Sequence, residues 1–348
     1  MAYTTIDKPT DYFRVKTYSG NSSTQSITWD ESDNMKPDWL WLKGRGYADG
    51  HALVDVIRGS TKNISSDSTT AEFTQTNGVT SLDTNGWSMG NWSAINRSSS
   101  GTAVGWGWLA GGTASSNTDG SITSSVSANT TAGFSIVSWT ADGGNTSTIG
   151  HGLSATPQII FYKRRDASSS WYVWVNGLID GSQDYLFLES TAAKGDLSGY
   201  GTPSSTTITN LGWGSGNSLI AYCFAEKKGY SKFGSYTGNG STDGTFVYTG
   251  FKPAFLIIKN TGAAKNWYLF DNKRDTYNAQ DSVLYPNLSN AETSVSDYNS
   301  LDVLSNGFKL RGGSTGVGDD TNGSYTYIYM AFAENPFVTS TGIPTTAR

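Results

Sequence analysis

The sequence contains very little cysteine, histidine or charge. A single cysteine, Cys223, excludes an internal disulfide, and with only two histidines the chain lacks the ligands for a Cys/His zinc site. Cys223 lies in an apolar run, where we predict a buried thiol. Only 15% of the residues are charged and the net charge is −5, which argues against a nucleic-acid binder with a basic stripe. We therefore expect no metal, no cofactor and no nucleic-acid partner.

Long apolar runs and helical periodicity are also missing. No stretch reaches the ~20 apolar residues that span a bilayer, so we expect no membrane insertion. Residues 1–9 lack the apolar segment of a signal peptide. The chain is instead rich in turn formers and aromatics, with 41 Gly, 12 Trp, 19 Tyr and 14 Phe. This composition predicts an all-β protein with many short strands.

One stretch of sequence occurs three times, and each copy has a proline, an apolar run and a lysine. The copies run from Pro37 to Lys43, from Pro157 to Lys163 and from Pro253 to Lys259. Proline suits the start of a strand because it cannot donate to a ladder, and the apolar run suits a strand buried on both faces. Fourteen residues after each proline stands His51, Trp171 or Trp267. We interpret these as packing positions, and the lysines as the points where the strand leaves the core.

Other features recur in the same order around this stretch. An aromatic residue opens each copy and a Gly-aromatic pair follows the proline; the aromatics of the pairs are Trp87, Trp213 and Phe308. The repeat of about a hundred residues exceeds solenoid and propeller periods and matches a small β-sandwich. We predict three tandem antiparallel β-sandwich modules. The expected domains are an N-terminal arm (1–12), modules at 13–112, 133–229 and 230–337, a Gly/Ser/Thr-rich linker (113–132) and a C-terminal tail (338–348).

Candidate chemistry is sparse. Glu226 and Glu334 occupy matching places after the closing strands of two copies, so we interpret them as solvated strand ends or as partners of Lys163 and Lys259. Asp-rich turns such as 142–145 and 319–323 lack EF-hand spacing and favour a turn role, although calcium binding stays open. No nucleophile elbow or phosphate loop is present. We expect no enzymatic activity.

Aromatic residues in loops are the remaining candidates for binding. Most aromatics should fill cores, but Trp92 follows Asn91 and Tyr200 lies in a Gly-Tyr-Gly loop. Loops carry binding residues more often than strands do. We therefore predict that Trp92 and Tyr200 stack on a sugar ring or on another subunit.

Parts of the chain resemble the repeats of virion proteins from marine tailed phages, which are tail-fibre-like or capsid-surface proteins. The similar segments are Tyr236–Ser241, Pro253–Lys259, Met330–Phe337, Thr5–Pro9 and Gly342–Arg348. The resemblance implies lectin-like or jelly-roll-like sandwiches and a place in the virion, assembled in the host cytoplasm. It brings no catalytic residues. The first copy departs most, with His51 in place of Trp and a Gly-Trp-Gly-Trp ending in place of Phe-Ala-Glu.

These observations lead to one main hypothesis. We expect a non-enzymatic tail fibre or receptor-binding protein that contacts host-surface glycan through loops and joins other virion proteins through residues 1–12. On this hypothesis, deleting residues 1–12 leaves a folded protein that no longer joins particles. The alternatives are a capsid decoration protein without a ligand and a carbohydrate-active depolymerase. Whether the chain forms a homo-oligomer stays open.

Overall fold

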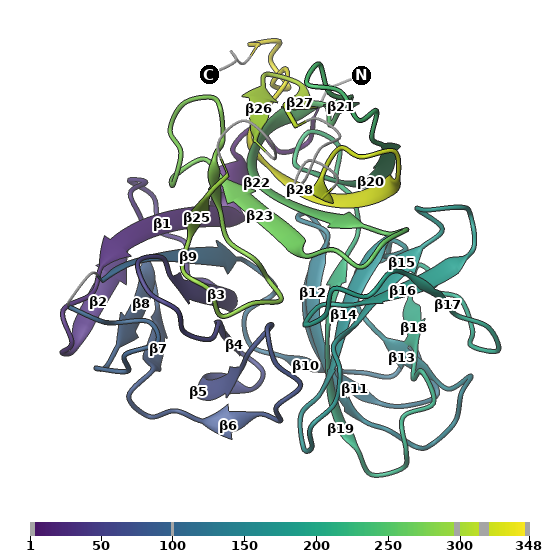
Figure 1. Cartoon of the computed structure of the whole chain (residues 1–348). Coiled ribbons are helices and arrows are strands. Elements are labelled where there is room, and N and C mark those ends of the chain that lie inside the picture. The colour runs from purple at the N-terminus through teal and green to yellow at the C-terminus, as the bar shows by residue number, and fades with distance from the viewer. Residues whose placement is uncertain (1–3, 99–100, 296–299, 313–319, 345–348) are drawn as a thin grey trace.

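The protein folds into antiparallel β-sheets, which confirms the all-β prediction. The computed structural model describes residues 4–98, 101–295, 300–312 and 320–344. Within these ranges there is one 3-10 turn, η1 (Pro9–Asp11), no α-helix, and hence no helix that could cross a membrane. Figure 1 shows three lobes, and each of them contains one copy of the repeat. We call them the first, second and third lobes in chain order.

Each lobe has one large sheet built around the repeated proline-to-lysine stretch. In all three, that strand pairs with the closing strand of the copy on one side and with the strand that follows it in the chain on the other. In the first lobe the order is β1 (Phe13–Ser19), β9 (Thr102–Trp108), β3 (Trp39–Gly44), β4 (Ala52–Asp55), β5 (Gly59–Ile64) and β6 (Phe73–Thr74). In the third it is β20 (Ser231–Thr237), β28 (Thr326–Pro336), β22 (Phe251–Asn260) and β23 (Trp267–Asp271).

The large sheet of the second lobe is the longest and corrects one domain prediction. Its order is β10 (Ser115–Asn117), β11 (Ser124–Asn129), β12 (Phe134–Thr140), β19 (Ser218–Phe224), β14 (Ile159–Arg164), β15 (Tyr172–Asn176), β16 (Gln183–Phe187) and β17 (Gly195–Asp196). Residues 113–132 are therefore not a linker, because β10 and β11 extend this sheet. Val126 pairs with Val137 and is buried in the core of the second lobe. The small polar residues around Val126 in the sequence gave no sign of this buried position.

Smaller sheets cover one face of each large sheet. They are β2 (Gln25–Thr28), β8 (Gly86–Met89) and β7 (Val79–Asp83) in the first lobe, β13 (Thr148–Gly150) and β18 (Thr207–Thr209) in the second, and β21 (Phe246–Tyr248), β27 (Gly307–Leu310) and β26 (Leu301–Leu304) in the third. The third lobe also has a short hairpin, β24 (Ser282–Val283) and β25 (Thr293–Ser294).

Successive side chains of the repeated strand point to opposite faces of the sheet, so they pack in two different apolar cores. In β3, Leu40 and Leu42 pack in the core of the first lobe, whereas Trp39 and Trp41 point to the opposite face. The same alternation occurs in β14 and β22, so each of these strands is buried on both faces.

The second face of each large sheet lies in a core that all three lobes share. Trp39 of the first lobe stacks on Tyr222 of the second, with ring centroids 4.5 Å apart. Phe13 of the first lobe stacks on Phe332 of the third at 5.3 Å, and Phe224 of the second contacts Phe332 edge-on at 6.1 Å. The three copies are thus joined around one continuous apolar core.

The N-terminal segment is part of this body, which corrects the prediction of a free arm. Residues 1–3 lie outside the described ranges, but Ile6 is only 3% exposed and belongs to the shared core. The Thr4 hydroxyl donates to the Lys228 carbonyl at 3.0 Å. At the other end, the Ser340 amide donates to Asp7 Oδ1 at 2.6 Å, so the terminal segments lie together. Deleting residues 1–12 should therefore destabilise the fold.

Candidate binding groove in the second lobe

The three repeated lysines are fully buried at the contacts between lobes. Each ammonium group donates to one backbone carbonyl of its own lobe and to one of a neighbour. The neighbouring acceptors are Ser289 for Lys43 (3.2 Å), Thr69 for Lys163 (2.8 Å) and Thr191 for Lys259 (3.2 Å). Burial lowers the pKa of Lys43 and Lys163 to about 8 and that of Lys259 to about 7.

The residues fourteen places after each proline also bond to a backbone carbonyl of a neighbouring lobe. Trp171 Nε1 donates to the Ser65 carbonyl at 2.8 Å, and Trp267 Nε1 donates to the Phe187 carbonyl at 3.0 Å. His51 Nδ1 accepts from Trp41, so the Nε2 proton faces the Tyr285 carbonyl at 3.0 Å. Burial, with a smaller effect of Lys43, lowers the pKa of His51 to about 3, so the ring is neutral.

Together these contacts form a closed cycle. Side chains of the first lobe donate to carbonyls of the third, those of the third to carbonyls of the second, and those of the second to carbonyls of the first. The repeated lysines and the residues fourteen places after the prolines therefore hold the lobes together and leave no room for a ligand.

The two repeated glutamates have other partners than the buried lysines. Glu226 accepts from Lys232 at 2.7 Å, and Glu334 lies 3.3 Å from the Lys252 ammonium. The Lys232–Glu226 pair is partly exposed and contributes little to stability, about 0–1 kcal/mol. In the other pair Lys252 is buried and Glu334 is partly exposed.

The repeated prolines do not share one position in their strands. Pro37 and Pro157 precede β3 and β14 by two residues, whereas Pro253 lies inside β22 at a break in its register with β28. A proline in a sheet is tolerated at such a bulge because the ladder is already interrupted there.

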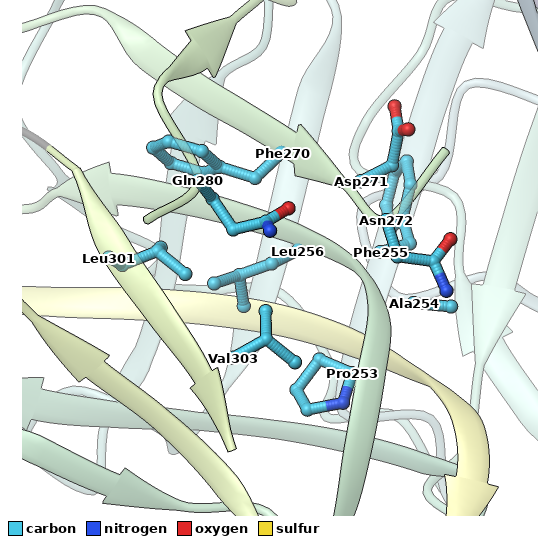
Figure 2. Close-up of a pocket in the computed structure, with 10 residues that line it drawn as sticks. All are labelled: Pro253, Ala254, Phe255, Leu256, Phe270, Asp271, Asn272, Gln280, Leu301 and Val303. Carbon is cyan, nitrogen blue, oxygen red and sulfur yellow. The ribbon is translucent and has the colours of Figure 1, made fainter. Parts of the chain in front are cut away.

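The bulge at Pro253 opens a small cavity, shown in Figure 2. Side chains of β22, β23 and β26 surround it, with the Gln280 amide at one side. Its volume is about 10 Å³, roughly the space of one water molecule. The Gln280 Oε1 atom is buried and has no partner among the described residues, so a single water would suit this cavity. It is too small for a larger ligand.

Trp92 and the Asp-rich turn at 142–145 make local contacts. Trp92 is half-buried at the edge of the first lobe's core and contacts Phe73 edge-on at 6.1 Å. Asp142 accepts from the Gly144 amide at 2.8 Å, a local turn bond. Asp319 lies outside the described ranges. Within those ranges, no three His, Cys, Asp or Glu side chains are placed to hold a metal.

Tyr200 lies in an aromatic groove of the second lobe. The groove has a volume of about 220 Å³, and its lining consists of Tyr172, Leu197, Tyr200, Leu211, Gly212 and Trp213. Tyr172 opens β15, and the other five residues come from the loops after β17 and β18. The sequence singled out Tyr200 and gave no sign that Tyr172 and Trp213 would join it.

Trp213 shares the Gly-aromatic sequence pattern with two core residues, but the strand pairing gives their place in the sheet to Ile208. In the first and third lobes the matching aromatics, Trp87 on β8 and Phe308 on β27, are completely buried in their own cores. In the second lobe, β18 ends before this position and the chain turns. Trp213 is therefore half-buried in a loop.

The turn before Trp213 has an unusual backbone. Leu211 and Gly212 both adopt left-handed conformations, with φ of 53° and 65°. A left-handed leucine costs about 1 kcal/mol or more, and such outliers persist where the surrounding structure enforces them, often at functional sites. Glycine suits position 212, because its φ of 65° lies in the left-handed region that residues with a Cβ atom rarely adopt.

Asn210 holds the turn in place from the core side. This side chain is fully buried; its Oδ1 accepts from Trp139 Nε1 at 3.0 Å, and its Nδ2 donates to the Trp213 carbonyl at 3.2 Å and to the Gly144 carbonyl at 3.0 Å. The groove wall is thus preorganised.

The other two lobes also use a buried asparagine to hold a turn, a feature that we did not predict from the sequence. Asn96 and Asn322 are fully buried and tie the turn after the opening strand. The residues before them accept from the opening aromatics: Tyr18 donates to the Ile95 carbonyl at 2.8 Å, and Tyr236 to the Thr321 carbonyl at 2.5 Å. The signal was present as an asparagine after a β-branched residue in each copy.

The aromatic rings and hydroxyls of the groove can stack on a ligand and hydrogen-bond to it. The lining of the groove contains no carboxylate, imidazole, thiol or ammonium. Tyr172 contacts Trp213 edge-on at 5.7 Å, and burial is the main reason that its pKa is raised, so its hydroxyl stays protonated at neutral pH. Within the described residues, the hydroxyls of Tyr172 and Tyr200 have no hydrogen-bond partner.

Comparison with known proteins gives a family without an assigned activity. No curated protein and no solved structure matches the chain. The model of a domain of unknown function, DUF7483, matches residues 8–336, which include all three lobes. The chain belongs to the DUF7483 family.

Proposed function

We propose that this protein is a non-enzymatic structural component of a phage particle, of the tail-fibre or receptor-binding kind, that contacts host-surface glycan. The observation that carries the glycan proposal is the groove of Tyr172, Tyr200 and Trp213. Half-buried aromatic rings with unused hydroxyls suit a ligand that has both an apolar face and hydroxyl groups, as a sugar ring has.

We further propose that each lobe is a β-sandwich module of lectin or jelly-roll type. In support, each large sheet faces a smaller sheet across its own apolar core. On this proposal the shared core is the scaffold, and binding depends on loops that differ between copies. The groove fits that division, since five of its six lining residues come from loops.

We also propose that the protein attaches to other virion proteins through the surface where its two terminal segments meet. The bond between Ser340 and Asp7 brings residues of both ends together.

A glycan array with purified full-length protein tests the glycan contact. We expect binding that Trp213→Ala abolishes and that Trp92→Ala, in the first lobe, leaves intact. Absence of any glycan hit, combined with less stable particles when the protein is removed, would favour the decoration protein without a ligand. Release of new reducing ends from host polysaccharide would favour the depolymerase.

A further inference from the structure

The exposed large hydrophobic side chains of this protein are gathered in one part of the chain. Among the residues that the structure describes there are five, and all belong to the third lobe or to the segment after it: Phe246, Tyr248, Tyr277, Tyr325 and Ile343. In the first and second lobes, every described side chain of this kind is buried or half-buried. Exposed hydrophobic residues that lie together on a surface mark an interaction site.

Two of these residues lie together on the outside of the third lobe's smaller sheet. Val247 of β21 pairs with Phe308 of β27 and points into the core of the lobe. Phe246 and Tyr248, on either side of Val247, therefore point outward, and they are 45% and 52% exposed. The outward residues of this sheet, which we call the outer face, are Phe246, Tyr248, Asp302, Leu304, Gly307 and Lys309.

The matching face of the first lobe is polar. The strand pairing places Ser26 and Thr28 of β2, both exposed, where β21 has its two aromatic residues. Ser88 on the neighbouring strand bonds to Ser26 at 2.7 Å and to Asp83 at 2.6 Å. Hydroxyl groups and a carboxylate suit a face that stays in water, whereas aromatic rings at the same positions suit a face that a partner covers.

The charged residues at the outer face are balanced in sign. Lys309 of β27 pairs with Asp243, which precedes β21 in the chain. Arg311, which follows β27, pairs with Asp302 of β26. These four groups carry no net charge together. They offer no counter-charge to a strongly acidic or basic partner, and they do not repel a second copy of the same face.

We infer that the outer face binds the outer face of a second copy of this chain. In a twofold contact the same surface serves both partners, so it must fit itself. Phe246 and Tyr248 lie two residues apart on one strand, and a copy turned by 180° places each Phe246 beside the Tyr248 of the other chain. Covering these rings stabilises the contact, and the balanced charges add no repulsion. The inference goes beyond the proposed function, which concerns host glycan and other virion proteins.

Sedimentation velocity of the full-length protein over a range of concentrations tests the inference. We expect a dimer that dissociates at micromolar concentrations, because three short strands offer a small interface. The double variant Phe246→Ser, Tyr248→Thr gives the third lobe the residues of the matching first-lobe positions. It should raise the dissociation constant about tenfold or more, because aromatic residues dominate the energy of such contacts. Circular dichroism establishes that the variant folds.

The matching positions of the first lobe provide the control. The double variant Ser26→Ala, Thr28→Ala should leave the dimer intact. A protein that stays monomeric at every concentration, or a dimer that Phe246→Ser, Tyr248→Thr does not weaken, would overturn the inference. Binding of a monomer to neutral phosphatidylcholine vesicles, lost in the same variant, would assign the outer face to a lipid surface and overturn it as well. The glycan array is a separate measurement, so each of these results leaves the proposed glycan contact standing.

Discussion

Two of the three contacts between lobes contain a buried polar trio, and the third is apolar at the same positions. Between the first and second lobes, Asp55 accepts from Tyr222 at 2.7 Å, and Arg58 bonds to both side chains. Between the first and third lobes the matching residues are Asp271, Arg274 and Trp106, with Trp106 Nε1 3.0 Å from Asp271 Oδ2. Between the second and third lobes the matching positions hold Val175, Leu178 and Met330.

The comparison shows that the members of a trio are either all polar-bonded or all apolar. A buried ion pair can be replaced by apolar residues of similar volume at little cost, but removing one partner leaves an uncompensated charge. At the second–third contact every member is apolar, so no buried group loses its partner.

A second pair of positions follows the same division. Arg165 pairs with Glu72, and Arg45 pairs with Glu292, both across contacts of the first lobe. At the second–third contact the matching residues are Lys194 and Thr261, which form no ion pair. They keep the backbone hydrogen bond that all three contacts share, from the Lys194 amide to the Thr261 carbonyl at 2.9 Å. The Lys194 side chain bonds instead to Asp180, Asp184 and Asp196 of its own lobe, so the second–third contact lacks this interlobe ion pair.

The largest expected effect on stability comes from removing one member of a buried polar trio and leaving the other two in place. Asp55→Ala should lower the free energy of unfolding by about 3–5 kcal/mol, because Arg58 stays buried without its partner. The triple variant Asp55→Val, Arg58→Leu, Tyr222→Met copies the second–third contact and should recover most of this loss. Urea unfolding followed by tryptophan fluorescence measures both. Val175→Ala is the apolar control, with an expected loss of about 2 kcal/mol; an equal loss in Asp55→Ala would refute the distinction.

Trp87 and Trp213 share a Gly-aromatic sequence pattern but should respond differently to substitution. Trp87→Ala removes a fully buried side chain and should cost about 3–5 kcal/mol of stability. Trp213→Ala removes a half-buried loop residue and should cost no more than about 1 kcal/mol. Thermal unfolding of the two variants under one set of conditions provides the measurement. Similar losses would mean that Trp213 has a packing role after all.

The buried lysines predict a smaller, pH-dependent effect. Their pKa values are lowered to about 7 or 8 in the folded protein from an ordinary 10.5. Between these values the unfolded chain binds more protons, so stability rises with pH, by up to about 1.4 kcal/mol per pH unit for each lysine. Lys259→Met should reduce this slope by one lysine between pH 7.5 and 9.5, measured by urea unfolding. Lys227→Met, at a more exposed position, is the matched variant that also removes one lysine.

Much of the scaffold was predictable from the sequence, because it rests on local patterns. The proline-to-lysine stretch alternates side chains that fit two apolar environments, and turn formers separate short strands. The sharing of one core was not predictable, since nothing in Trp39 or Phe332 tells which sheet each will face. The groove was only half predictable: Tyr200 was visible in its glycine-flanked loop, but Trp213 resembles its buried counterparts until the shorter β18 is known.

The central claim is that the three lobes unfold as one body around their shared core. Differential scanning calorimetry of the full chain tests it directly. We predict a single transition whose calorimetric and van't Hoff enthalpies agree, on the order of 200 kcal/mol for a chain of this length. Three separable transitions, each with about a third of that enthalpy, would show that the copies are independent modules and would contradict the account.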